Sequence, residues 1–295
     1  LTRYLEETGQ ELEDIYGGNK SWSDLRSDAG LVGQSAGPHE AILRRACGRL
    51  LHVDDMQRIE VYRRFFLAEE SPDPDLLSPR ERRLLRMLVG SLVAGAVGKD
   101  TSLREGAKLL WKHPQVCAEM CDLLDVLADR IEHVAVPLSI HPEVPLAIHG
   151  RYTRVEILAA FDVGEGAKVV PWQTGCYWAP NARADLFAFT FDKTSGQFSP
   201  TTRYRDYAIS PHLIHWESQS VTRADSDTGR RYQRHVANGS SAMLFARHRS
   251  DERAFYFLGP ATYVKHESEL PMAITWRLQH SLPGDLFAAF AAAVA

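Results

Sequence analysis

In the first half of the chain, apolar residues recur at helical spacing and polar residues fill the positions between them. The stretch Pro38–Leu51 places its apolar residues on one helical face: Ile42, Leu43, Ala46 and Leu50. The longer stretch Pro114–Val134 keeps an apolar stripe along its whole length. Short periodic segments broken by Gly and Pro are typical of a helical bundle, which we expect over residues 1–136.

Capping boxes mark several helix starts in this half. Ser78 is followed three residues later by Glu81, with Pro79 at the first helical position. Ser102 and Glu105 repeat the arrangement. In each box the serine side chain and the glutamate side chain satisfy free backbone N–H groups of the first turn. Both sites therefore predict helices that begin directly after the serine.

The pattern changes after the proline-rich segment 137–149. Thr153 and Glu156 form another capping box, which opens a short helix over Arg154–Phe161. Segments rich in Val, Ile, Phe, Tyr, Trp and Thr then predict strands over Lys168–Trp178, Asp185–Asp192, Thr201–Ser210, Leu213–Ser220, Ala242–Arg249, Ala254–Lys265 and Met272–Gln279. A last helix is expected over Asp285–Ala295.

These patterns predict an α+β protein with two domains. Residues 1–136 form the helical domain, and residues 150–295 form a β-rich domain with a few helices; residues 137–149 link them. Short strands separated by turns favour a curved, mainly antiparallel sheet. We expect that sheet to close into a barrel or to pack as a sandwich.

Polar side chains concentrate on one face of two predicted strands within SPTTRYRDYAISPHLIHWESQS, residues 199–220. Side chains alternate between the two faces of a strand. Alternation therefore gathers six polar residues on one surface: Arg203, Arg205, Tyr207, His215, Glu217 and Gln219. Tyr204 and Trp216 point the other way, toward a core. The shared surface is either solvated, with ion pairs that tie the strands, or a binding site.

The charge distribution favours a site. Net charge over the whole chain is -4, but residues 1–140 carry 18 basic and 23 acidic residues, whereas residues 200–249 carry eight arginines, no lysine and four acids. Arginine suits bidentate recognition of phosphates and base edges. Arg230 and Arg231 are further candidates for phosphate contacts, and Tyr232 and Trp178 are candidates for stacking on bases.

The four cysteines predict neither a disulfide framework nor a zinc site. Cys117 and Cys121 lie one helical turn apart in an apolar stripe, and no further ligands follow at short spacing. The longest apolar runs, Leu88–Gly98 and Leu286–Ala295, are too short to cross a bilayer. We therefore expect a reduced, cytoplasmic protein without metal, cofactor or membrane partner. Because the chain opens with Leu1 in helical sequence, we expect it to be the C-terminal part of a larger protein.

An ordered set of sequence blocks gives the chain a specific resemblance. After the segment 199–220 come TGRRYQRH at 228–235, AMLFAR at 242–247, FYFLGPATYVKHE at 255–267 and PMAITWRLQHSLP at 271–283. Together they resemble an uncharacterised C-terminal domain of bacterial superfamily II DEAD/DEAH-type helicases, which often carry an N-terminal phospholipase-D-like nuclease domain. The helical stretch, including GQELEDIYGGNKSWSDLRSDAGL, resembles the region that joins the helicase core to that domain.

The resemblance implies a DNA-handling parent protein in bacterial defence or repair, with the helicase core of the same polypeptide as a partner. It assigns no chemical role to individual residues of this domain. The chain itself contains no GxxxxGK[ST] motif and no DEAD-type box, so ATP hydrolysis is expected outside it. Whether this part of the protein is itself an enzyme is open.

Three functions remain open at this level. In the first, the β-rich domain binds nucleic acid, with DNA favoured, and reads a base that is modified or flipped out of its stack. In the second, Glu217 and Gln219 belong to a Mg²⁺-dependent restriction-type nuclease whose further carboxylates are Asp185 or Asp192, and Glu156. In the third, the chain is a protein-interaction or regulatory region of a helicase.

Overall fold

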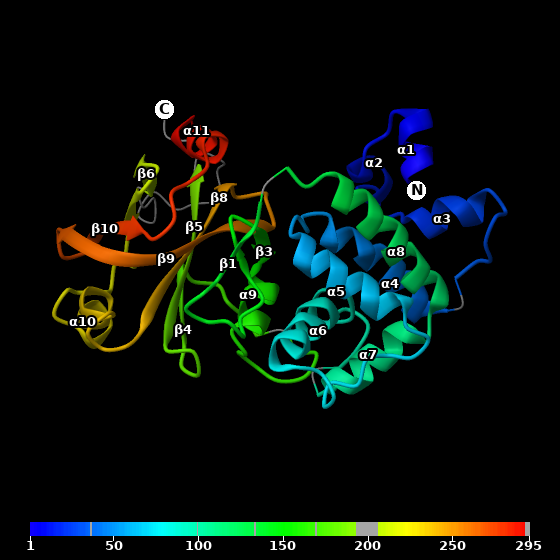
Figure 1. The fold of residues 1–295 in the computed structure, drawn as a ribbon, viewed down its shortest axis with the longest axis horizontal. Helices are drawn as coiled ribbons and strands as arrows, with labels where there is room; N and C mark the ends of the chain where they lie inside the picture. The colour runs from blue at the N-terminus through cyan, green and yellow to red at the C-terminus, as the bar shows by residue number, and fades with distance from the viewer. Residues whose placement is uncertain (36, 99, 133, 169, 193–205, 293–295) are drawn as a thin grey trace. The chain divides into compact units, whose positions relative to one another are not determined.

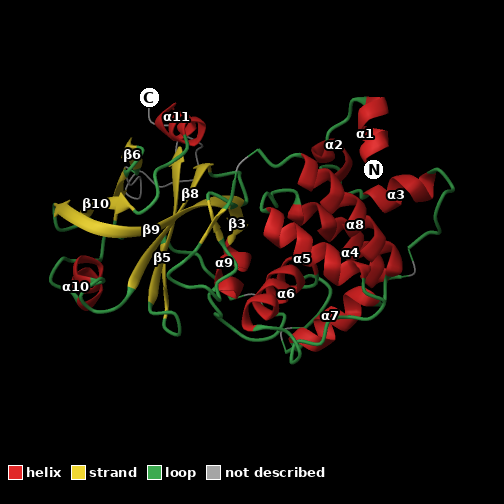
Figure 2. Cartoon of the chain, viewed as in Figure 1, coloured by secondary structure: helices red, strands yellow, loops and turns green. Residues whose placement is uncertain are grey.

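A computed structural model describes residues 1–292 with the exception of residues 36, 99, 133, 169 and 193–205. By its internal contacts the chain divides into two units, residues 1–146 with 150–170 and residues 147–149 with 171–295. Helices dominate the first unit and strands the second (Figure 2). The predicted α+β class is confirmed. Within the described part of the chain, no helix has the length and apolar character needed to span a membrane.

The first unit holds most of the helices (Figure 1). They are α1 (Thr2–Thr8), α2 (Leu12–Tyr16), α3 (Trp22–Asp28), α4 (Pro38–Cys47), the 3₁₀ turn Gly48–Leu50, α5 (Met56–Leu67), α6 (Pro79–Leu92), α7 (Leu103–Trp111), α8 (Pro114–Asp129) and α9 (Arg154–Ala160), with short strands β1 (Val136–Pro137) and β3 (Arg151–Thr153). The capping boxes predicted at Ser78, Ser102 and Thr153 are confirmed, because each hydroxyl accepts from the backbone N–H three residues on.

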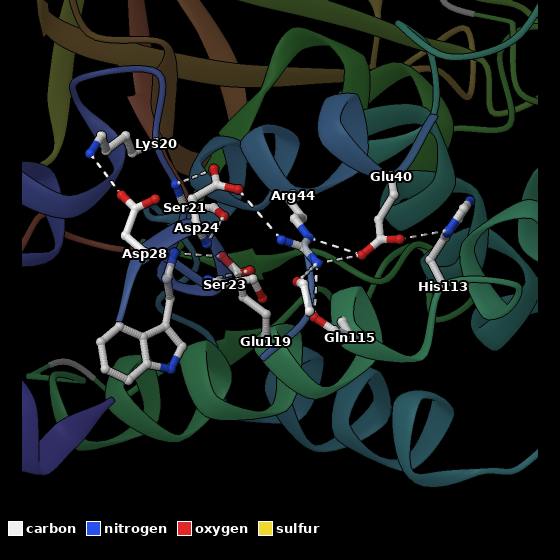
Figure 3. A network of polar contacts seen from close by, with 12 residues as sticks. Lys20, Ser21, Ser23, Asp24, Asp28, Glu40, Arg44, His113, Gln115 and Glu119 are labelled. Carbon is white, nitrogen blue, oxygen red and sulfur yellow. Dashed lines mark hydrogen bonds and ion pairs between the residues drawn. The ribbon is translucent and has the colours of Figure 1, made fainter. Parts of the chain in front are cut away.

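A buried carboxylate from α8 caps α3 (Figure 3). Glu119 is fully buried and accepts hydrogen bonds from the backbone N–H groups of Trp22 at 3.1 Å and Ser23 at 3.0 Å. The Tyr16 hydroxyl donates to the same carboxylate at 2.8 Å. Burial raises the pKa of Glu119, and these donors oppose that shift. One side chain therefore satisfies free N–H groups of α3 and ties α3 to α8.

Arg44 of α4 lies in the same polar network, with only 1% of its side chain exposed. Its guanidinium donates to the Glu40 carboxylate at 2.9 and 2.6 Å and to the Gln115 side chain of α8 at 2.8 Å. A buried charge of this kind requires its partners, because an uncompensated buried ion is strongly destabilising. The network thus ties α4 to α8, which lie against each other in the first unit.

The described residues of the second unit form most of the main sheet and two helices. Its strands are β2 (Ala147–Ile148), β4 (Cys176–Ala179), β5 (Ala184–Asp192), β6 (Tyr207–Ser210), β7 (Leu213–Glu217), β8 (Ser241–Arg249), β9 (Ala254–Glu267) and β10 (Ala273–Leu278), and its helices are α10 (Asp227–Arg234) and α11 (Gly284–Ala292). Every predicted strand segment overlaps one of these strands, but the predicted strand Lys168–Trp178 shares only its last three residues with β4. Residues 201–205 of the predicted strand Thr201–Ser210 lie outside the described part of the chain. The path through the main sheet is β4-β5-β8-β9-β10-β7-β6, antiparallel except for the parallel pair β5–β8.

The expected closure into a barrel is wrong. β4 and β6 lie at the two ends of the strand path, and the sheet stays open between them. The long strand β9 curves strongly (Figure 1), and register shifts occur where it pairs with β8 and with β10. Curvature alone does not close the sheet. Side chains from helices, Tyr232 of α10 and Leu286 and Phe290 of α11, instead complete the core on one face.

That core fixes which side chains of the sheet point inward. Phe187 of β5, Trp216 of β7 and Trp276 of β10 meet at ring-centroid distances of 4.8 and 5.1 Å around Phe187. Trp216 is buried, as its alternation predicts. Side chains at odd positions of β7 therefore lie on the opposite face of the sheet.

Candidate functional site

The described part of the second unit contains an open pocket beside α10, with a volume of about 370 Å³. Three separate segments build it: the end of β4 with the turn that follows, α10, and the turn after α10. Its lining is rich in arginine and comprises Trp178, Arg183, Asp227, Arg230, Arg231, Asn238 and Ser240. We call this hollow the arginine pocket. Its volume lies within the range typical of small-ligand sites.

Arg231 is the most tightly held cation of the pocket. Its Nε and Nη2 donate to the two carboxylate oxygens of Asp185 at 2.8 and 2.7 Å, a bidentate ion pair. Its Cζ also lies 4.5 Å from the centre of the Trp178 ring, within cation–π distance. The guanidinium is therefore held both by the two hydrogen bonds to Asp185 and by its contact with the Trp178 ring.

Arg183 and Arg230 are each engaged on one side. Arg183 donates from Nε to the carbonyl of Gly239 at 3.2 Å and from Nη2 to that of Asn238 at 2.5 Å. Carbonyl partners carry no charge, so the positive charge of Arg183 is not neutralised by them. Arg230 donates to Asp227 at 3.3 Å, an exposed pair on the first turns of α10 that contributes little to stability.

The sequence of α10 docks the helix against the sheet. Ser226 caps its N-terminus by accepting from the Gly229 N–H at 3.1 Å. At its C-terminus the buried His235 ring lies with Nδ1 2.9 Å from the Tyr232 carbonyl and Nε2 3.1 Å from the Ala261 carbonyl of β9. Tyr232 itself is buried in the core, so α10 presents its arginines from a fixed position.

The thiol of Cys176 lies beside the ion pair of Asp185 and Arg231. Tyr232 donates its hydroxyl to Cys176 Sγ at 3.1 Å, and Asp185 Oδ1 lies 4.0 Å from the same sulfur. Burial, and then the Asp185 charge, raise the pKa of Cys176 to about 12. Burial likewise raises the pKa of Asp185, an effect that Arg231 opposes. The surroundings of Cys176 therefore favour its protonated thiol, and Asp185 pairs with Arg231.

The residues predicted on β6 and β7 form a different group. The Tyr207 and His215 rings stack, and His215 Nε2 lies 4.0 Å from Glu217 Oε1. Gln219 lies beyond the end of β7, which the prediction had extended to Ser220. Arg203 and Arg205 lie outside the described residues, as does Tyr204.

The predicted residues thus divide between the two faces of the sheet. Trp178 stands directly opposite Asp185, which shares its face with the core residue Phe187, so the arginine pocket borders the core side. His215 and Glu217 alternate with Trp216 and lie on the other side. Of the predicted residues, four belong to the pocket side: Trp178, Arg230, Arg231 and the buried Tyr232.

Sequence reasoning missed Arg183, Asn238 and Ser240 as pocket residues. The Asn-Gly turn at 238–239 signals a loop, but nothing local indicates that Arg183, 55 residues earlier, donates to it. Asp185 was considered only as a metal ligand. Its pairing with Arg231 depends on the docking of α10 and carries no local signature.

Two of the carboxylates considered for a metal-dependent nuclease have cationic partners. Asp185 is held by Arg231. Glu156, fully buried in the first unit, lies 2.6 Å from His52 Nε2 and 3.2 Å from Arg58 Nη1. Burial opposes ionisation of Glu156, but His52 and then Arg58 lower its pKa to about 2. Across the described ranges, no cluster of three or more His, Cys, Asp or Glu side chains has a geometry suited to a metal ion.

Comparison with protein families places one domain in this chain. Residues 146–290 match the family described as "Domain of unknown function (DUF3427)", so a DUF3427 domain is present over these residues. The match includes the whole sheet path and the arginine pocket. Comparison with curated proteins gives no match for the chain.

Proposed function

We propose that the DUF3427 domain at residues 146–290 binds nucleic acid, DNA above all, through the arginine pocket. The observation that carries the proposal is the grouping of Arg183, Arg230 and Arg231 around the half-buried ring of Trp178. Guanidinium groups supply bidentate donors for phosphates, and aromatic rings supply stacking surfaces for bases. Both kinds of side chain line one pocket here.

The size of the pocket indicates which form of nucleic acid enters it. About 370 Å³ is room for roughly one nucleotide, and a base fills such a hollow only after it has left the stack of a duplex. We therefore propose that the ligand is an unpaired nucleotide, in a single strand or flipped out of a duplex, including a modified base. Asn238 and Ser240 at the rim offer hydrogen-bonding groups for a base edge.

The parent protein we propose is a helicase. Support comes from the sequence blocks at 199–283, which resemble the C-terminal domain of superfamily II helicases, and from the acidic balance of residues 1–140. An acidic helical region repels nucleic acid, and this suits a connection to a helicase core better than it suits DNA contact. Unpaired strands are the product of a helicase, so an accessory domain that holds them fits this context.

The proposal is tested with fluorescein-labelled single-stranded and duplex oligodeoxynucleotides against the full chain at several salt concentrations. We expect tighter binding of the single strand. Arg183→Ala and Arg230→Ala should each weaken it and flatten the dependence of log affinity on log salt by about one unit per lost phosphate contact.

A matched control separates a local contact from the effect of net charge. Arg253 is exposed in the loop after β8, whereas the pocket residue Ser240 lies just before the opposite end of that strand. Arg253→Ala removes the same charge and should bind as the wild type does. Equal losses in all three variants, or no binding by the wild type even at low salt, would refute the proposal.

A further inference from the structure

The ion pair between Asp185 and Arg231 is buried at one end only. The Asp185 side chain is 1% exposed, whereas that of Arg231 is 26% exposed and lines the arginine pocket. Asp185 engages Nε and Nη2, and among the described residues Nη1 has no hydrogen-bond partner. The carboxylate of the pair is therefore buried in the sheet, and its guanidinium faces the pocket.

The same strand pair also supplies the ring that lies against this cation. Trp178 of β4 and Asp185 of β5 are direct cross-strand partners, so their side chains stand side by side on one face. Arg231 contacts both: Nε and Nη2 donate to the carboxylate, and Cζ lies 4.5 Å from the Trp178 ring centre. A guanidinium that is held by a carboxylate and by an aromatic ring has lost most of its rotational freedom before any ligand binds.

We infer that Asp185 is a positioning residue that holds the Arg231 guanidinium over the Trp178 ring, so that a phosphate entering the pocket meets a preformed donor. The inference rests on the proposed nucleic-acid function, although the geometry it names does not require ligand. Asp185 acts through Arg231 and does not itself meet the ligand, because its carboxylate is buried beneath the guanidinium.

If Asp185 positions Arg231, Asp185→Asn should weaken binding; if Asp185 acts only through its charge, the same substitution should strengthen binding. A carboxylate near the site repels a phosphate, so its neutralisation in Asp185→Asn would tighten binding if charge alone mattered. Positioning predicts weaker binding, because an amide cannot hold the guanidinium by two charge-assisted hydrogen bonds. Arg231→Lys keeps the positive charge but loses the bidentate donor pair and the guanidinium over the Trp178 ring, and should also bind more weakly.

The first test measures binding of a fluorescein-labelled single-stranded oligodeoxynucleotide by the full chain. Asp185→Asn and Arg231→Lys should each weaken affinity, on the order of tenfold, and the double variant should be no weaker than either single one. Affinity equal to or tighter than the wild type in either single variant overturns the inference, as do losses that multiply in the double variant. If Asp185→Asn does not fold, Arg231→Lys decides by the same criterion.

The second test needs no ligand and separates the two proposals. In ¹⁵N spectra of arginine side chains, the Arg231 Nε–H signal, assigned by its loss in Arg231→Lys, should exchange slowly with water in the wild type and rapidly in Asp185→Asn. An Nε–H that exchanges equally in both refutes positioning even if oligonucleotide binds. The expected change in exchange, together with no oligonucleotide binding by the wild type, supports the positioning geometry and refutes the proposed function.

Discussion

The rings of Tyr207 and His215 stack across β6 and β7, with centroids 4.6 Å apart and planes inclined by 22°. They lie on the face of the sheet opposite to Trp216, whereas the arginine pocket borders the core side. The stack therefore belongs to a surface separate from the pocket, although sequence alternation and charge had suggested one site for both.

If the arginine pocket is the binding site, the stack should be dispensable for it. We expect Tyr207→Ala and His215→Ala to bind single-stranded oligodeoxynucleotide within about twofold of the wild type, because both side chains lie on the opposite face of the sheet and do not line the pocket. Fluorescence anisotropy with Arg230→Ala as the positive control checks this. If either variant loses as much affinity as Arg230→Ala, the binding site includes the β6–β7 face and the pocket assignment is wrong.

Trp216 should be among the most sensitive core positions of the second unit. Its side chain is 3% exposed, and its ring lies 4.8 Å from that of Phe187 and 5.9 Å from that of Tyr232. Trp216→Ala leaves a cavity among aromatic rings and should cost roughly 3–5 kcal/mol of unfolding free energy.

Near-UV circular dichroism during urea unfolding measures this loss for the aromatic core. The matched control is His215→Ala, one residue away on the opposite face, which should cost about 1 kcal/mol or less. Equal destabilisation by the two substitutions would contradict the inward orientation of Trp216.

Glu156 should make the stability of the first unit sensitive to acid. Its pKa falls from 4.5 to about 2 on folding, so its ionised form stabilises the native state at neutral pH. That stabilisation, roughly 3 kcal/mol, is present above about pH 4.5 and is lost as pH falls toward 2. Urea unfolding at several pH values across this range, followed by the helical circular-dichroism signal, should show the decline in unfolding free energy.

Two variants identify the carboxylate responsible for that decline. Glu156→Gln removes the titrating group, so the unfolding free energy should no longer decline between pH 4.5 and 2. The same substitution leaves the buried Arg58 uncompensated, at a cost of about 3–5 kcal/mol at neutral pH. Glu60→Gln, at an exposed position of α5, should retain the decline. An unchanged decline in Glu156→Gln would assign the acid sensitivity to another group.

Gly229 should be required for the docking of α10. A Cβ at this position would lie 2.1 Å from the carbonyl oxygen of Arg223, a backbone atom that cannot swing aside. Gly229→Ala should therefore displace the first turn of α10 and weaken oligonucleotide binding together with thermal stability. Gly284→Ala is the matched control, since nothing lies within 4 Å of its added Cβ. Wild-type melting by Gly229→Ala would contradict the close approach.

Features that depend on neighbours in the sequence could be predicted. The capping boxes at Ser78, Ser102 and Thr153 join groups three residues apart, and the chain satisfies them locally. Alternation within β7 likewise determined that Trp216 and His215 point to opposite faces, because this follows from the geometry of a single strand.

Features that depend on which distant segments become neighbours could not be predicted from the sequence. The arginine pocket joins Arg183, Arg231 and Asn238 through a parallel β5–β8 pairing and the docking of α10, and no local pattern encodes either. The sheet stayed open for the same reason, since closure depends on whether its edge strands β4 and β6 meet. Sequence by itself determined the capped helix starts, the approximate positions of most strands and the inward side of Trp216, but it did not predict α10. Contacts between distant residues, which form only when the whole core packs, decided how the strands were ordered and which arginines share a pocket.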